Sequence, residues 1–196
     1  MLPPLGLNGA AFELLNDDIA GRFSVLDSLM KFSAQYLIYI LVLVLVASWF
    51  VRVGGDEQRR LAVYTAVASA ALALVIAFVV REWYVTPRPF IARSPGDYVQ
   101  LIHHGADASF PSDHATAAFG LAAGALFYRR RLGALLLVLA AIIAFSRVYV
   151  GVHYPGDVLG GAAIGILAAV VVRFARPVLA YLDDLIVVRL VPAPLR

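Results

Sequence analysis

The chain has 196 residues, of which 62% are hydrophobic and only 15% charged. Soluble domains average about half apolar and about a quarter charged residues, so this composition excludes an ordinary soluble domain and indicates an integral membrane protein. Cysteine is absent, which excludes disulfide and thiol chemistry, and the basic residues behind the formal charge of +3 lack the aromatic-interleaved stripe of a nucleic-acid-binding protein.

The N-terminal segment is expected to be amphipathic. It lacks a basic stretch followed by an apolar core, so no secretory signal peptide is expected. Between Asn8 and Met30, apolar residues recur at helical spacing with acidic residues between them. This pattern predicts one or two amphipathic helices that lie at the membrane interface or cover the bundle. No internal repeat or long linker divides the chain, so we expect a single domain over residues 1–196.

Five apolar runs predict an all-α, polytopic membrane helix bundle. A helix needs about 20 predominantly apolar residues to cross a hydrocarbon core of about 30 Å. The five predicted spans are Gln35–Val53, Leu61–Val80, Ser112–Tyr128, Leu132–Val150 and Pro155–Phe174. The C-terminal segment Pro177–Arg196 contains Asp183, Asp184 and Arg189, so we expect a surface helix there, with a sixth span as a weaker alternative.

The arginine-rich turns set the expected orientation. Five spans bring the turns at residues 52–60 and 129–131 to the same side of the membrane, and the positive-inside rule makes that side cytoplasmic. The polar stretch of residues 81–110 and the turn that contains His153 are then outside. All of the candidate chemistry is therefore expected on the outer face.

An arginine, a histidine and an aspartate lie between the last two spans, in the sequence SRVYVGVHYPGD from Ser146 to Asp157. Ionisable groups at membrane depth usually bind or transform something. Pro155 suits the first turn of a helix, which places His153 just outside a helix N-terminus. Asp157 is then placed to accept the Nδ1 proton of His153 and to leave Nε2 as a free nucleophile. Taken alone, a polar turn with a helix-capping aspartate explains these residues equally well.

Two further polar clusters are expected on the same side. The first, REWYVTPRPF, contains Arg81 and Arg88; either one alone could be an arginine that snorkels at the end of a span. The second, FPSDHAT, contains Ser112, Asp113 and His114, and only the histidine has no role in a helix cap. Helix N-termini attract anions, and guanidinium groups match phosphate oxygens. Together the three clusters predict a phosphate site.

The order and spacing of the motifs carry a resemblance. R-x6-RP at Arg81–Pro89, PSDH at Pro111–His114 and SR-x5-H-x3-D at Ser146–Asp157 resemble the tripartite signature of the type-2 phosphatidic acid phosphatase superfamily. Within it, PRPF, HHGADASFPSDH and SRVYVGVHYPGD are similar to bacterial undecaprenyl-diphosphatases of the bacitracin-resistance type. The superfamily usually has lysine in place of Arg81 and glycine in place of Asp113, whereas PSDH agrees with the undecaprenyl-diphosphatase branch.

The resemblance implies a metal-independent, two-step phosphatase reaction without a cofactor. His153 would attack phosphorus to form a phosphohistidine, Asp157 would stabilise its imidazolium, and His114 would protonate the leaving oxygen. The residues expected to bind the phosphate are Arg81, Arg88, Arg147, Ser112, Asp113 and Ser146. His103 and His104 are interpreted as loop or headgroup contacts and not as metal ligands.

The implied substrate is undecaprenyl diphosphate, a polyprenyl lipid. Its hydrolysis to undecaprenyl phosphate and phosphate, outside the bacterial inner (cytoplasmic) membrane, would recycle a lipid carrier for cell-wall synthesis. A phosphatase or phosphotransferase acting on phosphatidylglycerophosphate, phosphatidic acid or lipid A is the alternative, and a non-catalytic membrane scaffold or channel is a more distant one. The tail preference and the oligomeric state, a homodimer included, are left open by the sequence.

Overall fold

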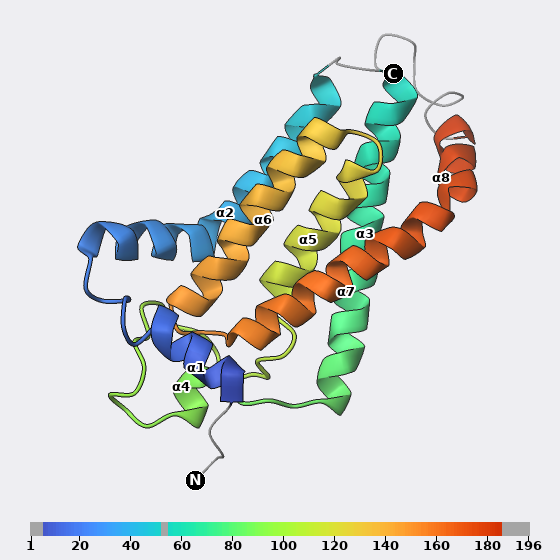
Figure 1. Ribbon diagram of the computed structural model, residues 1–196. Coiled ribbons are helices and arrows are strands. Elements are labelled where there is room, and N and C mark those ends of the chain that lie inside the picture. Colours follow the sequence, from blue (N-terminus) through green and yellow to red (C-terminus); the bar gives the residue numbers. More distant parts are fainter. Residues whose placement is uncertain (1–5, 52–54, 186–196) are drawn as a thin grey trace.

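The computed structural model describes residues 6–51 and 55–185, and within these ranges it contains helices and no strand (Figure 1). The all-α fold class is therefore confirmed. In chain order the elements are α1 (Gly6–Leu15), α2 (Ser24–Phe50), α3 (Asp56–Trp83), α4 (Pro89–Ala92), α5 (Asp113–Leu126), α6 (Arg130–Tyr149), α7 (Pro155–Phe174) and α8 (Arg176–Asp183).

Four of the described helices, α2, α3, α6 and α7, are long and apolar enough to cross a membrane. They have 20 to 28 residues, which corresponds to at least about 30 Å at 1.5 Å per residue. The third predicted span, Ser112–Tyr128, corresponds to α5, which has only 14 residues and is about 21 Å long. The predicted count of five spans is thus not confirmed, and α5 is a short helix inside the bundle.

Small residues let α5 pack closely against α3, α6 and α7. A Cβ atom built on Gly124 of α5 would lie 2.6 Å from the Cα of Ala66 in α3. A Cβ atom on Gly165 of α7 would lie 2.6 Å from the backbone oxygen of Thr116 in α5. Because backbone atoms occupy these positions, a larger residue at either glycine would push two helices apart. The glycines therefore fix the depth and direction at which α5 enters the bundle.

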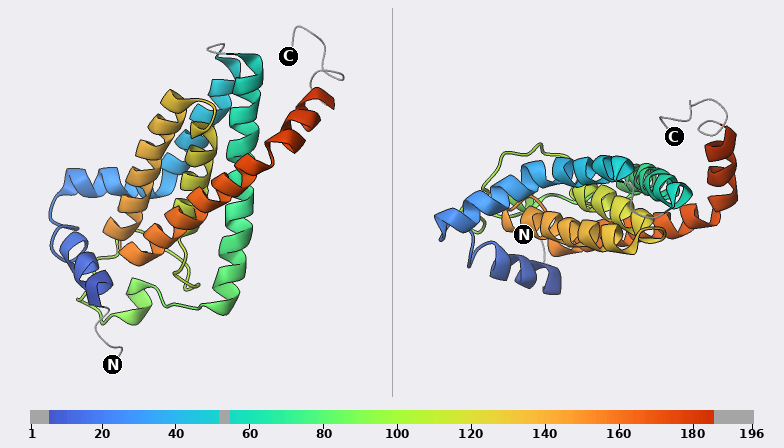
Figure 2. Two further views of the ribbon diagram at one scale, coloured as in Figure 1. Left: turned by 45° about the vertical axis from the view of Figure 1, so that its right-hand side comes forward. Right: turned by 90° about the horizontal axis from the view of Figure 1, so that it is seen from above.

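The predicted amphipathic segment, Asn8–Met30, is divided between α1 and the first turns of α2. Figures 1 and 2 show that the N-terminal part of α2 lies at a steep angle to the rest of that helix, and that α1 lies at the same end of the molecule as the loop between α3 and α5. Helix α1 contacts α6 and α7. These elements cover the end at which the polar clusters meet; their position in a membrane interface stays a prediction.

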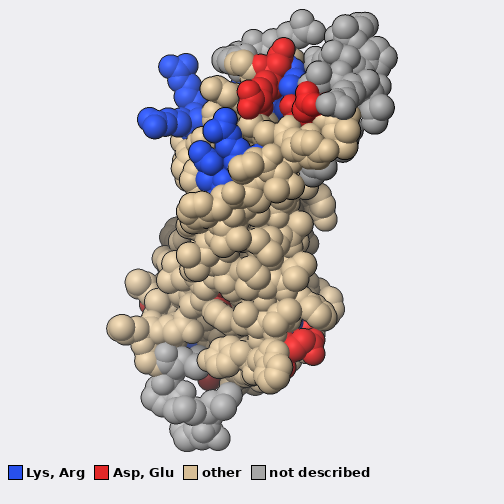
Figure 3. Space-filling view, turned by 90° about the vertical axis from the view of Figure 1, so that its right-hand side faces the viewer, with Lys and Arg blue, Asp and Glu red and all other residues tan. Residues whose placement is uncertain are grey.

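The opposite end carries the basic turns. In the face shown in Figure 3, Lys and Arg side chains gather at the upper end, while the middle of the molecule is mostly uncharged. The turn between α5 and α6, with its run of arginines at residues 129–131, lies at this upper end in Figure 1. The distribution agrees with the expected cytoplasmic side, although the orientation itself stays a prediction.

The C-terminal segment is only partly described. Helix α8 has 8 residues and is too short to be a span, and residues 186–196 lie outside the described residues. Asp183, which the sequence analysis took as a sign of a surface helix, is in fact buried and pairs with Arg60 of α3. Its carboxylate accepts hydrogen bonds from Nε at 2.7 Å and Nη2 at 2.9 Å of that arginine. This ion pair fixes α8 against α3.

Candidate active site

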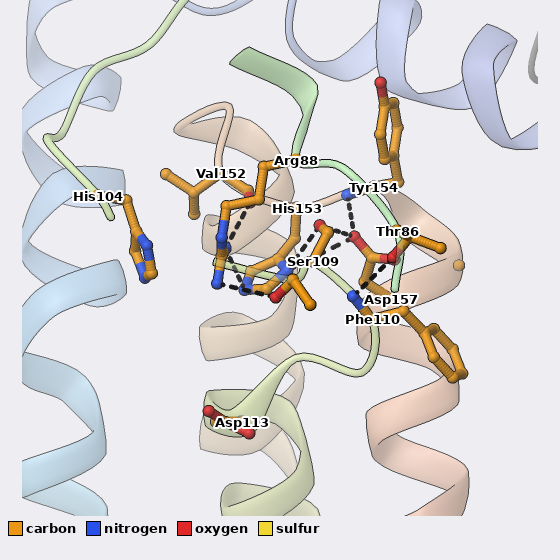
Figure 4. Close-up of polar contacts among 12 residues, drawn as sticks. Thr86, Arg88, His104, Ser109, Phe110, Asp113, Val152, His153, Tyr154 and Asp157 are labelled. Atoms are coloured by element: carbon orange, nitrogen blue, oxygen red, sulfur yellow. Dashed lines mark hydrogen bonds and ion pairs between the residues drawn. The ribbon is translucent and has the colours of Figure 1, made fainter. Parts of the chain in front are cut away.

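Two parts of the chain that are far apart in the sequence meet at the end of the bundle opposite the arginine-rich turn (Figure 4). One is the loop of residues 84–112 with the start of α5 that follows it, and the other is the turn between α6 and α7. Arg88 of the loop donates to the backbone oxygen of Val152 at 2.8 Å and lies 3.1 Å from Nε2 of His153. The backbone N–H of Ser112 donates to the backbone oxygen of Asp157 at 3.1 Å. The structure therefore brings one residue of each predicted cluster into direct contact with the others.

His153 is held between two elements and is 2% exposed. Pro155 begins α7, as the sequence predicts, and Asp157 Oδ2 accepts the backbone N–H of Tyr154 at 2.8 Å. The same oxygen lies 3.5 Å from Nδ1 of His153. The Asp157 carboxylate therefore caps α7 and also contacts the histidine, as the two interpretations predicted. The capping bond holds the carboxylate next to the His153 ring.

A residue that the sequence analysis did not select completes this contact. The Ser109 hydroxyl is fully buried, donates to Oδ2 of Asp157 and lies 3.4 Å from Nδ1 of His153. It therefore contacts both the imidazole and the carboxylate (Figure 4). The only sequence signal for Ser109 is its position three residues before Ser112, and neither spacing nor periodicity distinguishes it from an ordinary loop serine.

Arg88 fixes the other side of the His153 ring. Its side chain is 4% exposed, and its remaining bonds go to a carboxylate oxygen of Asp107 at 3.0 Å and to the backbone oxygen of Ala108 at 3.4 Å. A guanidinium group has no acceptor, so Nε2 of His153 must be the acceptor of the contact with Arg88. The proton of the neutral ring then lies on Nδ1, toward Ser109 and Asp157. This tautomer keeps the proton off Nε2, whose lone pair accepts from Arg88 here and becomes the nucleophile once Arg88 donates to a phosphoryl oxygen instead.

The electrostatic surroundings keep that ring neutral. Burial lowers the pKa of His153 to about 4; the charges of Arg88 and Arg147 act in the same direction, and the hydrogen bond with Asp157 opposes them. A histidine normally titrates near pH 6.5. At neutral pH the His153 imidazole is therefore uncharged, as attack on phosphorus requires.

Arg147 and Ser112 supply donors without protein acceptors. Arg147, on α6, is 2% exposed and donates from Nη1 to the backbone oxygen of Ala34 in α2 at 3.1 Å. Its Nε and Nη2 atoms, and the Ser112 hydroxyl, are buried without a hydrogen-bond partner among the described residues. Buried polar groups are rarely left unpaired because each costs about 1–3 kcal/mol. These donors suit an anionic ligand.

Other predicted phosphate-binding residues have different partners. Arg81, at the end of α3, forms an ion pair with Asp113, at the start of α5. Figure 4 places Asp113 apart from the hydrogen-bonded group around His153. The Ser146 hydroxyl donates to the backbone oxygen of Ile143 in its own helix at 2.7 Å. In this structure Arg81 pairs with Asp113, while its Nε is buried without a hydrogen-bond partner among the described residues. Ser146 is turned away along α6.

His114 and His104 lie close to His153 and its neighbouring arginines. His114 is partly buried at the start of α5 and interacts electrostatically with Arg147 and His153. The ring centroid of His104 lies 6.3 Å from that of His153, in an edge-on arrangement. Within residues 6–51 and 55–185, no group of three or more metal-ligating side chains is found.

The PAP2 superfamily pattern matches residues 61–178, which is more than half of the chain. The chain therefore belongs to the PAP2 superfamily, and the resemblance inferred from its motifs is confirmed. It is 40% identical over 144 residues to undecaprenyl-diphosphatase BcrC of Bacillus subtilis (strain 168), an alignment that covers 74% of this chain and 72% of that protein. It is 40% identical over 141 residues to the putative undecaprenyl-diphosphatase YbjG of Escherichia coli (strain K12), covering 71% and 68%.

The fold is also similar to that of a solved structure. The crystal structure of Aquifex aeolicus LpxE superposes with a TM-score of 0.69 at 27% identity, covering 87% of this chain and 97% of that one. With its four apolar helices, the chain is a multi-pass membrane protein of a lipid phosphatase family.

Proposed function

We propose that this protein hydrolyses undecaprenyl diphosphate to undecaprenyl phosphate and phosphate at the outer face of the bacterial inner membrane. The observation that carries the proposal is the buried His153, whose Nε2 lies 3.1 Å from the Arg88 guanidinium and whose Nδ1 faces Ser109 and Asp157. An unprotonated imidazole nitrogen beside a cationic anion-binding group is suited to attack on phosphorus once the guanidinium donates to the bound phosphoryl group and releases the lone pair. The similarity to undecaprenyl-diphosphatases supports the choice of substrate.

The first step transfers the terminal phosphoryl group to the enzyme. The Nε2 lone pair of His153 forms a bond to phosphorus while the bond from phosphorus to the bridging oxygen breaks. His114 donates a proton to that leaving oxygen, which departs as part of undecaprenyl phosphate. The imidazole becomes a phosphohistidine cation, whose Nδ1–H is stabilised by the Asp157 carboxylate and oriented by Ser109. Burial lowers the pKa of His114 to about 3, so solvent supplies its proton before the first turnover, and the second step restores it for each later one.

The second step releases phosphate. The now neutral His114 takes a proton from a water molecule as the water oxygen bonds to phosphorus and the bond from phosphorus to Nε2 breaks. Arg88, Arg147 and Ser112 hold the phosphoryl oxygens in both steps, because donors that are fixed in advance stabilise the charge that develops in the transition state. The unpartnered Nε and Nη2 of Arg147 are available for this purpose.

The remaining predicted residues act less directly in this proposal. Asp113 pairs with Arg81 and positions that guanidinium at the start of α5, and the Nε of Arg81, which has no partner among the described residues, is left for a phosphate. Ser146 is bonded within α6 and supports the helix that carries Arg147. The lipid tail stays among the apolar helices while the diphosphate enters from the outer interface.

The test is phosphate release by the purified full-length protein from a panel of lipids, with EDTA present. We expect undecaprenyl diphosphate to be hydrolysed faster than phosphatidic acid, phosphatidylglycerophosphate or lipid A. His153→Ala should abolish turnover while leaving expression and thermal unfolding close to wild type. Phosphate release from another lipid but none from undecaprenyl diphosphate would refute the substrate, and an active His153→Ala variant would refute the nucleophile.

A further inference from the structure

His104 and Asp107 lie beside the candidate active site but have no role in the reaction described above. Asp107 accepts a hydrogen bond from Nε of Arg88 at 3.0 Å, and the same carboxylate oxygen lies 3.6 Å from Nδ1 of His104. The His104 ring stands edge-on to that of His153, with centroids 6.3 Å apart. In Figure 4, His104 lies on the opposite side of Arg88 from Ser109 and Asp157.

The two histidine rings differ in their access to ligand. The side chain of His153 is 2% exposed, whereas that of His104 is 25% exposed. Nδ1 of His104 is directed to its own loop, at 3.2 Å from the backbone oxygen of Gly105 and near Asp107. This arrangement fixes the ring through Nδ1 and leaves Nε2 for a ligand. His104 thus presents a partly open Nε2 atom beside a buried nucleophile.

Asp107 links this ring to the anion-binding guanidinium. Although burial raises the pKa of Asp107, the hydrogen bond and charge of Arg88 outweigh that effect and lower it below the usual value. The carboxylate is therefore ionised at neutral pH and holds both Arg88 and His104 through one oxygen. It sets the distance between the group that binds the reacting phosphate and the neighbouring ring.

We propose that His104, held in place by Asp107, forms a second phosphoryl subsite, which binds the non-reacting phosphoryl group of a lipid diphosphate. This inference rests on the proposed function and deepens it. A monophosphate needs only the donors around His153, namely Arg88, Arg147 and Ser112. A diphosphate brings a second anionic group to the leaving side, and that group needs its own donor.

The protonation of His104 supports this assignment. Burial lowers the pKa of His104, and the nearby charges of Arg88 and Arg147 add to the effect. The ring is therefore neutral in the empty site at pH 7. An arriving diphosphate offsets those two positive charges and favours the protonated ring. His104 then donates a charge-assisted hydrogen bond to the phosphoryl oxygens only when a diphosphate is present.

The experiment compares farnesyl diphosphate with farnesyl phosphate, because the two probes share one tail and differ by one phosphoryl group. His104→Ala should lower kcat/KM for farnesyl diphosphate about 10- to 100-fold, mainly through KM, as expected for the loss of a charge-assisted hydrogen bond. Turnover of farnesyl phosphate should change by less than about twofold. The matched control is His103→Ala, which removes an exposed histidine from the adjacent position and should change neither reaction.

A second readout does not depend on diphosphate hydrolysis. Phosphate and methylenediphosphonate, a diphosphate with a carbon bridge, are compared as inhibitors of farnesyl phosphate turnover. His104→Ala should weaken inhibition by methylenediphosphonate about 10-fold or more and leave inhibition by phosphate unchanged.

The outcomes separate the two proposals. Equal losses on both farnesyl substrates, no loss on either, or an unchanged ratio of the two inhibition constants would each overturn the second subsite. A wild-type protein that hydrolyses no lipid diphosphate would refute the proposed function. In that case a His104-dependent preference for methylenediphosphonate still supports the subsite, and the absence of that preference overturns it.

Discussion

Replacing Ser109 by alanine tests whether the hydroxyl that contacts both His153 and Asp157 takes part in catalysis. Oδ2 of Asp157 accepts from Ser109 and from the Tyr154 backbone N–H at 2.8 Å, and it lies 3.5 Å from Nδ1 of His153. Ser109→Ala deletes the first of these bonds. A hydrogen bond to a charged group contributes about 1.5–3 kcal/mol, and each 1.36 kcal/mol corresponds to a tenfold change in rate. We therefore expect kcat/KM to fall about 10- to 150-fold.

The pH profile separates this role from a structural one. Protonated His153 cannot attack phosphorus, so activity is lost as the pH falls through the pKa of His153, which burial lowers to about 4. Without the Ser109 hydrogen bond, the Asp157 carboxylate interacts more strongly with the imidazolium, and the pKa of His153 rises. The acidic limb of kcat/KM in Ser109→Ala should therefore move to higher pH.

The assay is phosphate release from undecaprenyl diphosphate between about pH 3 and about pH 8, a range that brackets the pKa of about 4. Ser94→Ala, which changes an exposed serine of the same loop, is the matched control and should behave like the wild type. An unchanged rate and an unchanged acidic limb would refute the role of Ser109. A lower rate with an unmoved limb and a lower melting temperature would show that the serine only supports the fold.

Arg147→Ala should lower kcat/KM about 100- to 1,000-fold, as for the loss of a transition-state donor, and should reduce the free energy of unfolding by only about 1 kcal/mol, because its one protein bond goes to Ala34. Normal phosphate release by this variant would contradict the phosphate-binding role. The chain lacks cysteine, so a single introduced cysteine is the one thiol that a maleimide can label, and its labelling reports on which side of the membrane it lies. On intact cells a membrane-impermeant maleimide should label Asp97→Cys and should reach Arg131→Cys only after lysis; the reverse pattern would place the site in the cytosol.

Local spacing was enough to predict the relation between His153 and Asp157. Pro155 marks the start of α7, so His153 was expected just before the helix and Asp157 in its first turn. Four residues make about one helical turn, which brings the two side chains close together. The contact of His153 with Arg88 is not local. It was inferred because residues 81–110 and the last turn were expected on one side of the membrane, and the structure places the two side chains 3.1 Å apart.

The number of spans depends on the length of each helix, which hydropathy does not give. The run that includes α5 is as apolar as a span, but much of it is alanine and glycine, which pack equally well inside a bundle. The helix begins after Ser112 and ends at Leu126, where the chain turns toward the arginines. Its length is therefore set by its neighbours and by the turn, and not by the thickness of a membrane.

The choice of side-chain partner was the least predictable feature. Asp113 was expected near the phosphate, and its negative charge there needed a partner; the structure provides Arg81, 32 residues away. Ser109 and Asp107 lie in a loop whose path follows from its contacts with Thr86, Arg88 and Asp157. No periodic pattern describes such a path, so their roles became visible only in three dimensions.

The amide of Asn16 links parts of the chain that share no motif. It is fully buried, and it exchanges hydrogen bonds with both backbone groups of Val99 and donates to the backbone oxygen of Tyr149, at 2.7 to 2.8 Å. Tyr149 ends the helix that leads into the turn with His153. A shortened protein that began after Asn16 would keep every residue of the phosphatase signature. It would nevertheless lose the hydrogen bonds that hold the loop at Val99 and the end of α6 in place beside His153.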